Sequence, residues 1–281
     1  MIQHLLQLIW NQRKQNAWLW AELLLVSVFL WFLVDYLYVM GRTYTAPLGF
    51  DIRHTYSIVI SSLSERSPDY IPKEKRERPD GVHLLTALDR IRTYPGVESA
   101  CLTDGGMPYY MGSRNLVWRI DTLQVPCRYA FVTPEFFDVF RIYDKDGKTA
   151  SLKRAIEDNN SIVISADVET MNPGLSLLGQ KAYRGNVTDE IEETIRGISV
   201  PIRRHEYTKA EPNVYRALRL SRMEEGYYEG MIDAVRLCVR VRPDVDNADF
   251  PARFRKDMAE QLRLGNLYLL DVQPLSYIRN G

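Results

Sequence analysis

One uninterrupted hydrophobic run stands out in the chain, over residues 17–40. As an α-helix that rises about 1.5 Å per residue it would be about 36 Å long, enough to cross a hydrocarbon layer of about 30 Å with some tilt. Its inner part, Leu23–Val34, carries no charge, and aromatic residues stand near both ends, as at a membrane interface. We predict an uncleaved transmembrane helix, because a soluble core helix needs a polar face and a cleaved signal needs a shorter apolar region.

Two acids, Glu22 and Asp35, interrupt this run close to its ends. A charge at the centre of a bilayer costs about 2.5–3.5 kcal/mol, and the cost falls toward the interface. Interfacial placement or contact with a partner helix therefore suits these two side chains. A proton relay is the alternative interpretation.

Residues 1–16 carry a second, weaker hydrophobic pattern. Four apolar residues fall on one stripe of a helix, at positions i, i+3, i+4 and i+7: Ile2, Leu5, Leu6 and Ile9. This spacing predicts a short amphipathic helix that lies on a membrane surface. The alternative is that the first turns of the membrane helix simply continue into water.

After residue 40 the apolar positions alternate, or step by three and four, as in the strands and helices of a folded domain. Asp80 can cap the first helix. The predicted elements are strand 54–63, helix 81–93 and strand 97–102, then strand 232–241, helix 247–264 and strand 267–272. The chain thus contains two strand–helix–strand units.

The region between these units, residues 141–212, has predicted strands of its own at 161–165, 181–184 and 194–200. Two strand–helix–strand units around an insertion predict an α+β fold, with two lobes that share a sheet. The lobes would be 45–140 and 213–275, and the inserted α+β subdomain would be 141–212.

Charge and composition narrow the function only a little. The 281 residues include 36 basic and 36 acidic side chains, so no overall basic field attracts nucleic acid. The hydrophobic content of 46% is that of a folded protein.

Candidate chemistry is sparse. Residues 174–181 resemble a phosphate-binding loop only in outline, because Lys181 comes one position late and no Ser or Thr follows it. The four histidines are scattered, without the spacing of metal ligands: His4, His54, His83 and His205. We expect no catalytic residue, no metal site and no cofactor, and hence no enzyme.

The cysteines, Cys101, Cys127 and Cys238, are odd in number and form no C-x-x-C pair. Outside the cytoplasm Cys101 and Cys127 could form a disulfide, and buried free thiols are the alternative. The alternation of its strand places Cys238 between Arg236 and Arg240, which we expect to point outward.

Residues 129–142 read YAFVTPEFFDVFRI and predict a structural joint. A strand ends at Val132, Thr133 caps a short helix and Pro134 takes its first position. Phenylalanines then anchor this helix against the sheet. The predicted joint residues are Thr133, Pro134, Phe136, Phe137 and Phe140.

A glycine-flanked loop, residues 105–112, carries Tyr109, Tyr110 and Met111. These side chains could contact a partner or a substrate. A plain exposed loop is the alternative.

The joint sequence resembles the V-T-P-x-F-F-x-V-F segment in the extracytoplasmic domain of MacB-like (FtsX-like) ABC transporter permeases. Three further segments resemble that family in the same order: SIVISA at 161–166, LLGQKAYR at 177–184 and TIRGISVPIRRHEY at 194–207. Pro201 and the pair Arg203 and Arg204 depart from the family pattern at the turn of the third segment. The resemblance extends over nearly the whole chain.

The resemblance implies an N-terminus in the cytoplasm, a helix in the bacterial inner membrane and a porter-like domain outside it, over residues 45–275. Members of the family continue into three more membrane helices and work as homo- or heterodimers. It also implies a partner ATPase subunit, which would bind the ATP, and contact with membrane lipid. We expect no nucleic-acid partner.

We therefore expect a non-catalytic permease subunit of an ABC-type export or mechanotransmission complex. The alternative is a single-pass envelope sensor or scaffold without an ATPase partner. The sequence does not choose among substrates.

Overall fold

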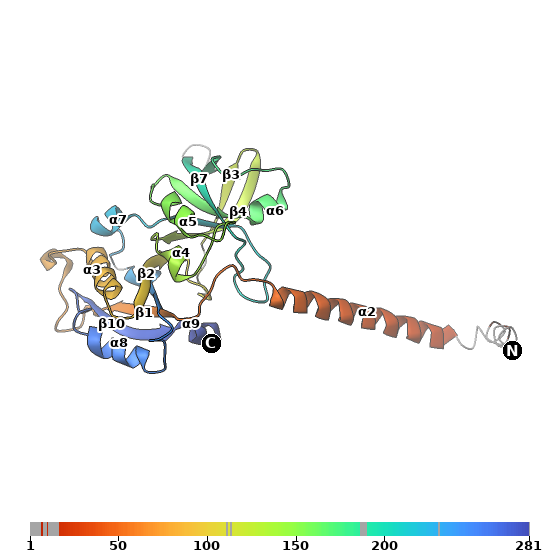
Figure 1. Cartoon of the computed structure of the whole chain (residues 1–281), viewed down its shortest axis with the longest axis horizontal. Helices are drawn as coiled ribbons and strands as arrows, with labels where there is room; N and C mark the ends of the chain where they lie inside the picture. Colours follow the sequence, from red (N-terminus) through yellow and green to blue (C-terminus); the bar gives the residue numbers. More distant parts are fainter. Residues whose placement is uncertain are drawn as a thin grey trace. The chain divides into compact units, whose positions relative to one another are not determined.

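The computed structural model describes residues 7, 10, 17–110, 112, 114–185, 190–229 and 231–280. The chain forms two units, of which the first contains the long helix α2 (Ala17–Thr45) and the second is a domain that begins at Pro47 (Figure 1). Helix α2 has no buried residue, and among the described helices it is the one long and apolar enough to cross a membrane. It runs beyond the predicted end at residue 40. The helix predicted over residues 1–16 lies outside the described residues, apart from positions 7 and 10.

One half of the domain is an open antiparallel sheet with strand order β10-β1-β9-β2. Its elements are β1 (Thr55–Ser62), α3 (Asp80–Arg92), β2 (Val97–Asp104), β9 (Val235–Val241), α8 (Phe250–Met258) and β10 (Leu267–Pro274). The two strand–helix–strand units interleave, because β9 lies between β1 and β2 while β1 lies between β9 and β10. This is the ferredoxin-like arrangement, and it confirms that the two predicted units share a sheet.

The other half is a closed ring of six strands, β3-β4-β8-β5-β7-β6, in which β6 pairs back to β3. Its strands are β3 (Arg114–Ile120), β4 (Leu123–Val132), β5 (Ser161–Ser165), β6 (Lys181–Arg184), β7 (Ile191–Ser199) and β8 (Asn213–Ala217). Closing the ring removes free strand edges. The ring takes strands from both sides of residues 141–212, which were expected to form the insertion, as well as strands from within that range.

Strand β4 belongs to both halves. Along most of its length it pairs with β3, and its last residues pair with β8 on one side. On the other side Phe131 and Val132 pair with Asp104 and Thr103 of β2. The ladder that joins the open sheet to the ring is therefore two residue pairs long.

Short helices complete the domain: α4 (Phe136–Val139), α5 (Ala150–Ala155), α6 (Asp167–Met171), α7 (Leu220–Glu224) and α9 (Leu275–Asn280), with 3-10 turns at Lys73–Lys75 and Ile232–Ala234. Strands β5 and β6 have the predicted bounds. Strands β3 and β8 were not predicted. Helix α8 is shorter than the predicted 247–264.

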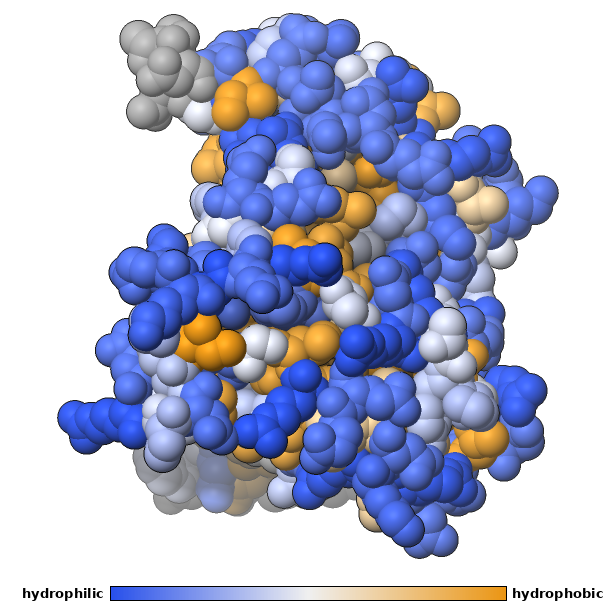
Figure 2. Space-filling view, turned by 90° about the vertical axis from the view of Figure 1, so that its left-hand side faces the viewer, coloured by the Kyte–Doolittle hydropathy of each residue, from blue (hydrophilic) through white to orange (hydrophobic). Residues whose placement is uncertain are grey.

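Three hydrophobic cores hold these elements. The first lies between the open sheet and helices α3 and α8, and the third fills the inside of the ring around Trp118. The second lies between the two halves and contains the phenylalanines of α4. In Figure 2, on the face that carries α3 and α7, the surface is largely hydrophilic and hydrophobic residues show in the hollow between the two halves.

Candidate functional site

The predicted joint lies in the core between the sheet and the ring. Phe136, Phe137 and Phe140 are fully buried, and the Phe136 and Phe137 ring centroids lie 5.5 and 5.6 Å from that of Tyr215 on β8. The same core contains Cys101 and Cys238 from the open sheet. These aromatic side chains therefore pack against both halves of the domain at once.

Thr133 and Pro134 also lie at the joint, but they do not start the helix. The Thr133 N–H donates to the carbonyl of Leu102 at 3.0 Å, and its hydroxyl accepts from the Leu102 N–H at 3.1 Å. Helix α4 instead has Glu135 at its N-terminal boundary, without a side-chain cap, and Pro134 lies in the preceding turn. The prediction that Thr133 caps this helix was wrong: Thr133 ties the joint to β2.

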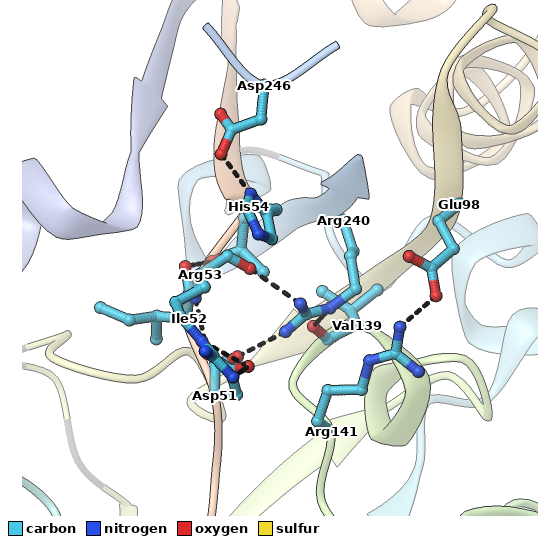
Figure 3. A network of polar contacts seen from close by, with 10 residues as sticks. Asp51, Ile52, Arg53, His54, Glu98, Val139, Arg141, Arg240 and Asp246 are labelled. Carbon is cyan, nitrogen blue, oxygen red and sulfur yellow. Dashed lines mark hydrogen bonds and ion pairs between the residues drawn. The ribbon is translucent and has the colours of Figure 1, made fainter. Parts of the chain in front are cut away.

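Arg240 on β9 is the polar centre of this region (Figure 3). The residue is only 3% exposed, and its guanidinium donates to three backbone carbonyls, each 2.7–2.8 Å away. The acceptors are the carbonyls of Val139 in α4 and of Asp51 and Arg53 before β1. The prediction that this arginine points outward was wrong, because α4 and its core cover the second face of the sheet.

The three carbonyls belong to segments that are far apart in sequence. Residues 47–53 connect the hydrophobic helix to β1, and four hydrogen bonds attach them to the rest of the domain. Arg203 N–H donates to the Leu48 carbonyl at 3.0 Å, Asp51 N–H donates to the Phe140 carbonyl at 2.8 Å, and Arg240 holds the carbonyls of Asp51 and Arg53. The connecting segment is thereby fixed to both the joint helix and the central strand.

Charged residues surround this network. The Arg53 side chain donates to the Asp51 carboxylate, and His54 Nδ1 lies 2.5 Å from Asp246. Burial acts to raise the pKa of Asp51, but hydrogen bonds from Arg53 outweigh it and the pKa lies below its usual value. His54 (φ 59°) and Arg141 (φ 51°) adopt the left-handed backbone conformation that side chains disfavour. Such residues persist where the surrounding contacts are strong.

The loop that carries Tyr109 and Tyr110 lies against the joint, while Met111 lies outside the described residues. Gly106 permits this close approach, because a Cβ there would lie 2.5 Å from Thr103 Oγ1 and 3.2 Å from the Phe136 ring. Tyr109 packs edge-on against Phe50 with ring centroids 5.7 Å apart. The Arg236 guanidinium lies over the Tyr110 ring, 5.0 Å from its centroid. The two tyrosines line a pocket. Whether they contact a partner remains a prediction.

All three cysteines are free and buried. Cys127 lies inside the ring, whereas Cys101 belongs to the core between the halves. The alternative of a disulfide between them is not found. Cys101 instead faces Cys238 across the β2–β9 ladder.

The inside of the ring holds a buried charge cluster that no pattern in the sequence predicted. Glu193 on β7 is 2% exposed and accepts from Arg216 Nε at 2.7 Å and from the Trp118 indole at 3.2 Å. Burial lowers the pKa of Arg216, and the charge of Glu193 opposes this shift. Among the described residues no group of three or more metal-ligating side chains comes together.

No protein-family model matches this sequence, and no curated protein matches it. Solved structures do match. A domain of a protein described as a permease, from Porphyromonas gingivalis, has 19% sequence identity and a TM-score of 0.50, over 80% of this chain and 91% of that chain.

Two further structures are less similar. The periplasmic region of MacB from Actinobacillus actinomycetemcomitans has 9% identity and a TM-score of 0.44, over 85% of this chain and 96% of that one. The extracellular domain of the noncanonic ABC-type transporter YknZ from Gram-positive bacteria has 11% identity and a TM-score of 0.42, over 76% and 100%. At these identities the likeness is one of fold, and of these three structures the Porphyromonas gingivalis domain has a TM-score that reaches 0.5. The domain described here has the fold of a permease domain, as the resemblance of its sequence to MacB-like permeases implies.

Proposed function

We propose that this chain is a non-catalytic permease subunit of an ABC-type export or mechanotransmission complex. The observation that carries the proposal is the combination of a membrane-length hydrophobic helix with a domain of permease fold. Helix α2 would cross the bacterial inner membrane with its N-terminus in the cytoplasm, and the domain would lie outside.

Arg240 and residues 47–53 suggest how the domain would receive motion from the membrane. A displacement of the connecting segment acts on β9 through Arg240, and on α4 through the bond from Asp51 to Phe140. Helix α4 packs against both halves of the domain. The same displacement would therefore reach the open sheet and the ring together.

The proposed partners are an ATPase subunit, which would bind and hydrolyse ATP, and a second permease, in a homo- or heterodimer. The chain itself would supply the membrane anchor and the moving external domain, in contact with membrane lipid.

The test is affinity purification of the complete gene product from native membranes in a mild neutral detergent, followed by mass spectrometry. We expect an ATP-binding cassette subunit to copurify, and its ATPase rate to change when Arg240 is replaced by Met. Recovery of the protein without any ATPase would overturn the proposal and favour the single-pass sensor or scaffold.

A further inference from the structure

A small pocket lies where the Tyr109–Tyr110 loop meets strands β4 and β8. Its cavity volume is about 40 Å³, whereas about 10–15 Å³ on this measure holds one water molecule. The pocket therefore has room for a small group such as a carboxylate or a phosphate. Anything larger must extend outward through its mouth.

The charge of the pocket is one-sided. Its lining residues, all in the described part of the chain, include the arginines Arg128, Arg203 and Arg204 and no aspartate or glutamate. Two acids outside the lining influence its titratable groups: the charge of Glu211 acts to raise the pKa of Arg128, and that of Asp167 acts to raise the pKa of Tyr215. The lining itself favours an anion.

Among the described residues that line the pocket, Arg128 has a buried donor atom without a partner. Its Nε atom is buried and has no hydrogen-bond partner among the described residues. A buried donor without a partner costs about 1–3 kcal/mol, and more when it is charged. Burial first, and repulsion from Arg204 second, lower the pKa of Arg128. An anionic ligand would satisfy the donor and relieve the repulsion.

The remaining walls are apolar and aromatic. They come from Phe50, from Met107 and Tyr109 in the loop, and from Ile142 and Tyr215 on the joint side. Tyr109 holds the left-handed backbone conformation at φ 61°, which costs free energy unless its contacts compensate. Its ring packs on Phe50 at the pocket. The site thus combines the guanidinium of Arg128 with flat apolar and aromatic walls.

We propose that this pocket binds the anionic head of a small amphiphilic ligand, an oxygen-based carboxylate or phosphate group attached to an apolar body. Arg128 is the principal donor, because a guanidinium offers paired N–H groups to such oxygens. Arg203 and Arg204 add positive charge, and the aromatic walls contact the apolar body. The proposal does not depend on an ATPase partner.

The test is calorimetric titration of the full chain in a neutral maltoside detergent and a phosphate-free buffer. The first probe, phenyl phosphate, carries both the anion and the apolar ring. Inorganic phosphate carries the anion alone, and benzyl alcohol carries the ring alone. We expect saturable binding of phenyl phosphate at least tenfold tighter than of either other probe. Dihexanoyl phosphatidic acid is the fourth probe. If it binds more tightly than phenyl phosphate, the natural ligand is a lipid head group; if it binds more weakly, the natural ligand is a free solute.

Three variants locate the site. Arg128→Gln should weaken phenyl phosphate binding at least tenfold, and Arg128→Lys, which keeps the charge but loses the fork, about threefold. Arg196→Gln, at an exposed arginine of the ring, is the matched control and should bind like the wild type. Equal affinity of Arg128→Gln and wild type, or absence of saturable binding by the folded wild-type chain, would overturn the proposal.

Discussion

Arg240 in the open sheet and Arg216 in the closed ring are both buried, but their charges are met in different ways. Arg216 pairs with the buried carboxylate of Glu193, and both residues lie on strands of the ring. Arg240 donates its hydrogen bonds to carbonyl oxygens outside the sheet; the carboxylate that attracts it most is Asp51, before β1, and Glu98 on β2 attracts it less. The ring pairs its buried charge with a side chain of its own strands, whereas the hydrogen-bond acceptors of Arg240 belong to segments outside the sheet.

The difference follows from topology. A closed ring has an inside, which its own alternating side chains can fill. An open sheet has two faces, and helices α3 and α8 cover only one of them. Helix α4 and residues 47–53 complete the other face, and Arg240 holds them there. The open half is therefore the part of the domain whose integrity depends on the segment that follows helix α2.

The strongest way to break this arrangement is Phe137→Asp. It removes a fully buried ring and places a carboxylate without a partner in the core between the halves. We expect a loss of more than about 5 kcal/mol in the free energy of unfolding, seen as failure to recover a folded domain. Phe137→Leu keeps the site apolar and should retain a cooperative thermal transition. An unchanged melting temperature for Phe137→Asp would reject the placement of this side chain.

Glu193→Ala tests the claim that the ring neutralises its own charge. It leaves Arg216 buried without a carboxylate, which should cost about 3–5 kcal/mol in urea unfolding of the detergent-purified chain. Glu192→Ala is the matched control on the same strand, because Glu192 forms a half-exposed pair with Lys181. That pair should contribute about 0–1 kcal/mol. Similar losses of unfolding free energy for both variants would show that the buried cluster contributes no more to stability than the exposed pair.

Arg240→Met tests the dependence of the open half on residues 47–53. It leaves three carbonyls without their donor and should lower the free energy of unfolding by about 1–3 kcal/mol. We also expect faster protease cleavage within residues 47–53, measured by mass spectrometry of the fragments. Arg53→Gln is the control, because that side chain is 79% exposed and should contribute less than about 1 kcal/mol. Unchanged cleavage in Arg240→Met would mean that other contacts hold this segment.

The smallest effect should come from His83 on α3, at the covered face of the open sheet. Burial, together with Arg78 and Arg76, lowers its pKa below the usual 6.5, although Asp80 opposes the shift. The unfolded state then binds the proton more readily. The contribution of His83 to stability is present above pH 6.5 and is lost as the pH falls through the lowered pKa. We expect His83→Gln to flatten the decline in unfolding free energy between pH 7 and pH 5; an unchanged slope would contradict this.

Local patterns in the sequence predicted much of the fold. Strands β5 and β6 were predicted with their bounds, and the phenylalanines of the joint were predicted to be buried, because each signal is contained in a few neighbouring residues. Strand β3 was missed, since charged residues interrupt its short apolar pattern, and closure of the ring depends on partners far apart in sequence.

The candidate site was harder to predict for a related reason. Arg240 alternates with apolar residues along β9, a pattern typical of a strand with one face in water. Its burial depends on α4 and residues 47–53, which reach it from elsewhere in the chain. The unpartnered Arg128 is likewise visible only once β4 and β8 lie side by side.

The two-pair ladder between β2 and β4 has a mechanical consequence. Hydrogen bonds spread along a strand resist rotation in proportion to their spacing, and the two pairs, with the adjoining bonds between Thr133 and Leu102, give only a short lever arm. This ladder therefore resists swivelling of the ring against the sheet less than it resists stretching along β4, which the covalent chain itself opposes. The aromatic packing of Phe136 and Phe137 against Tyr215 then sets how stiff that swivel is.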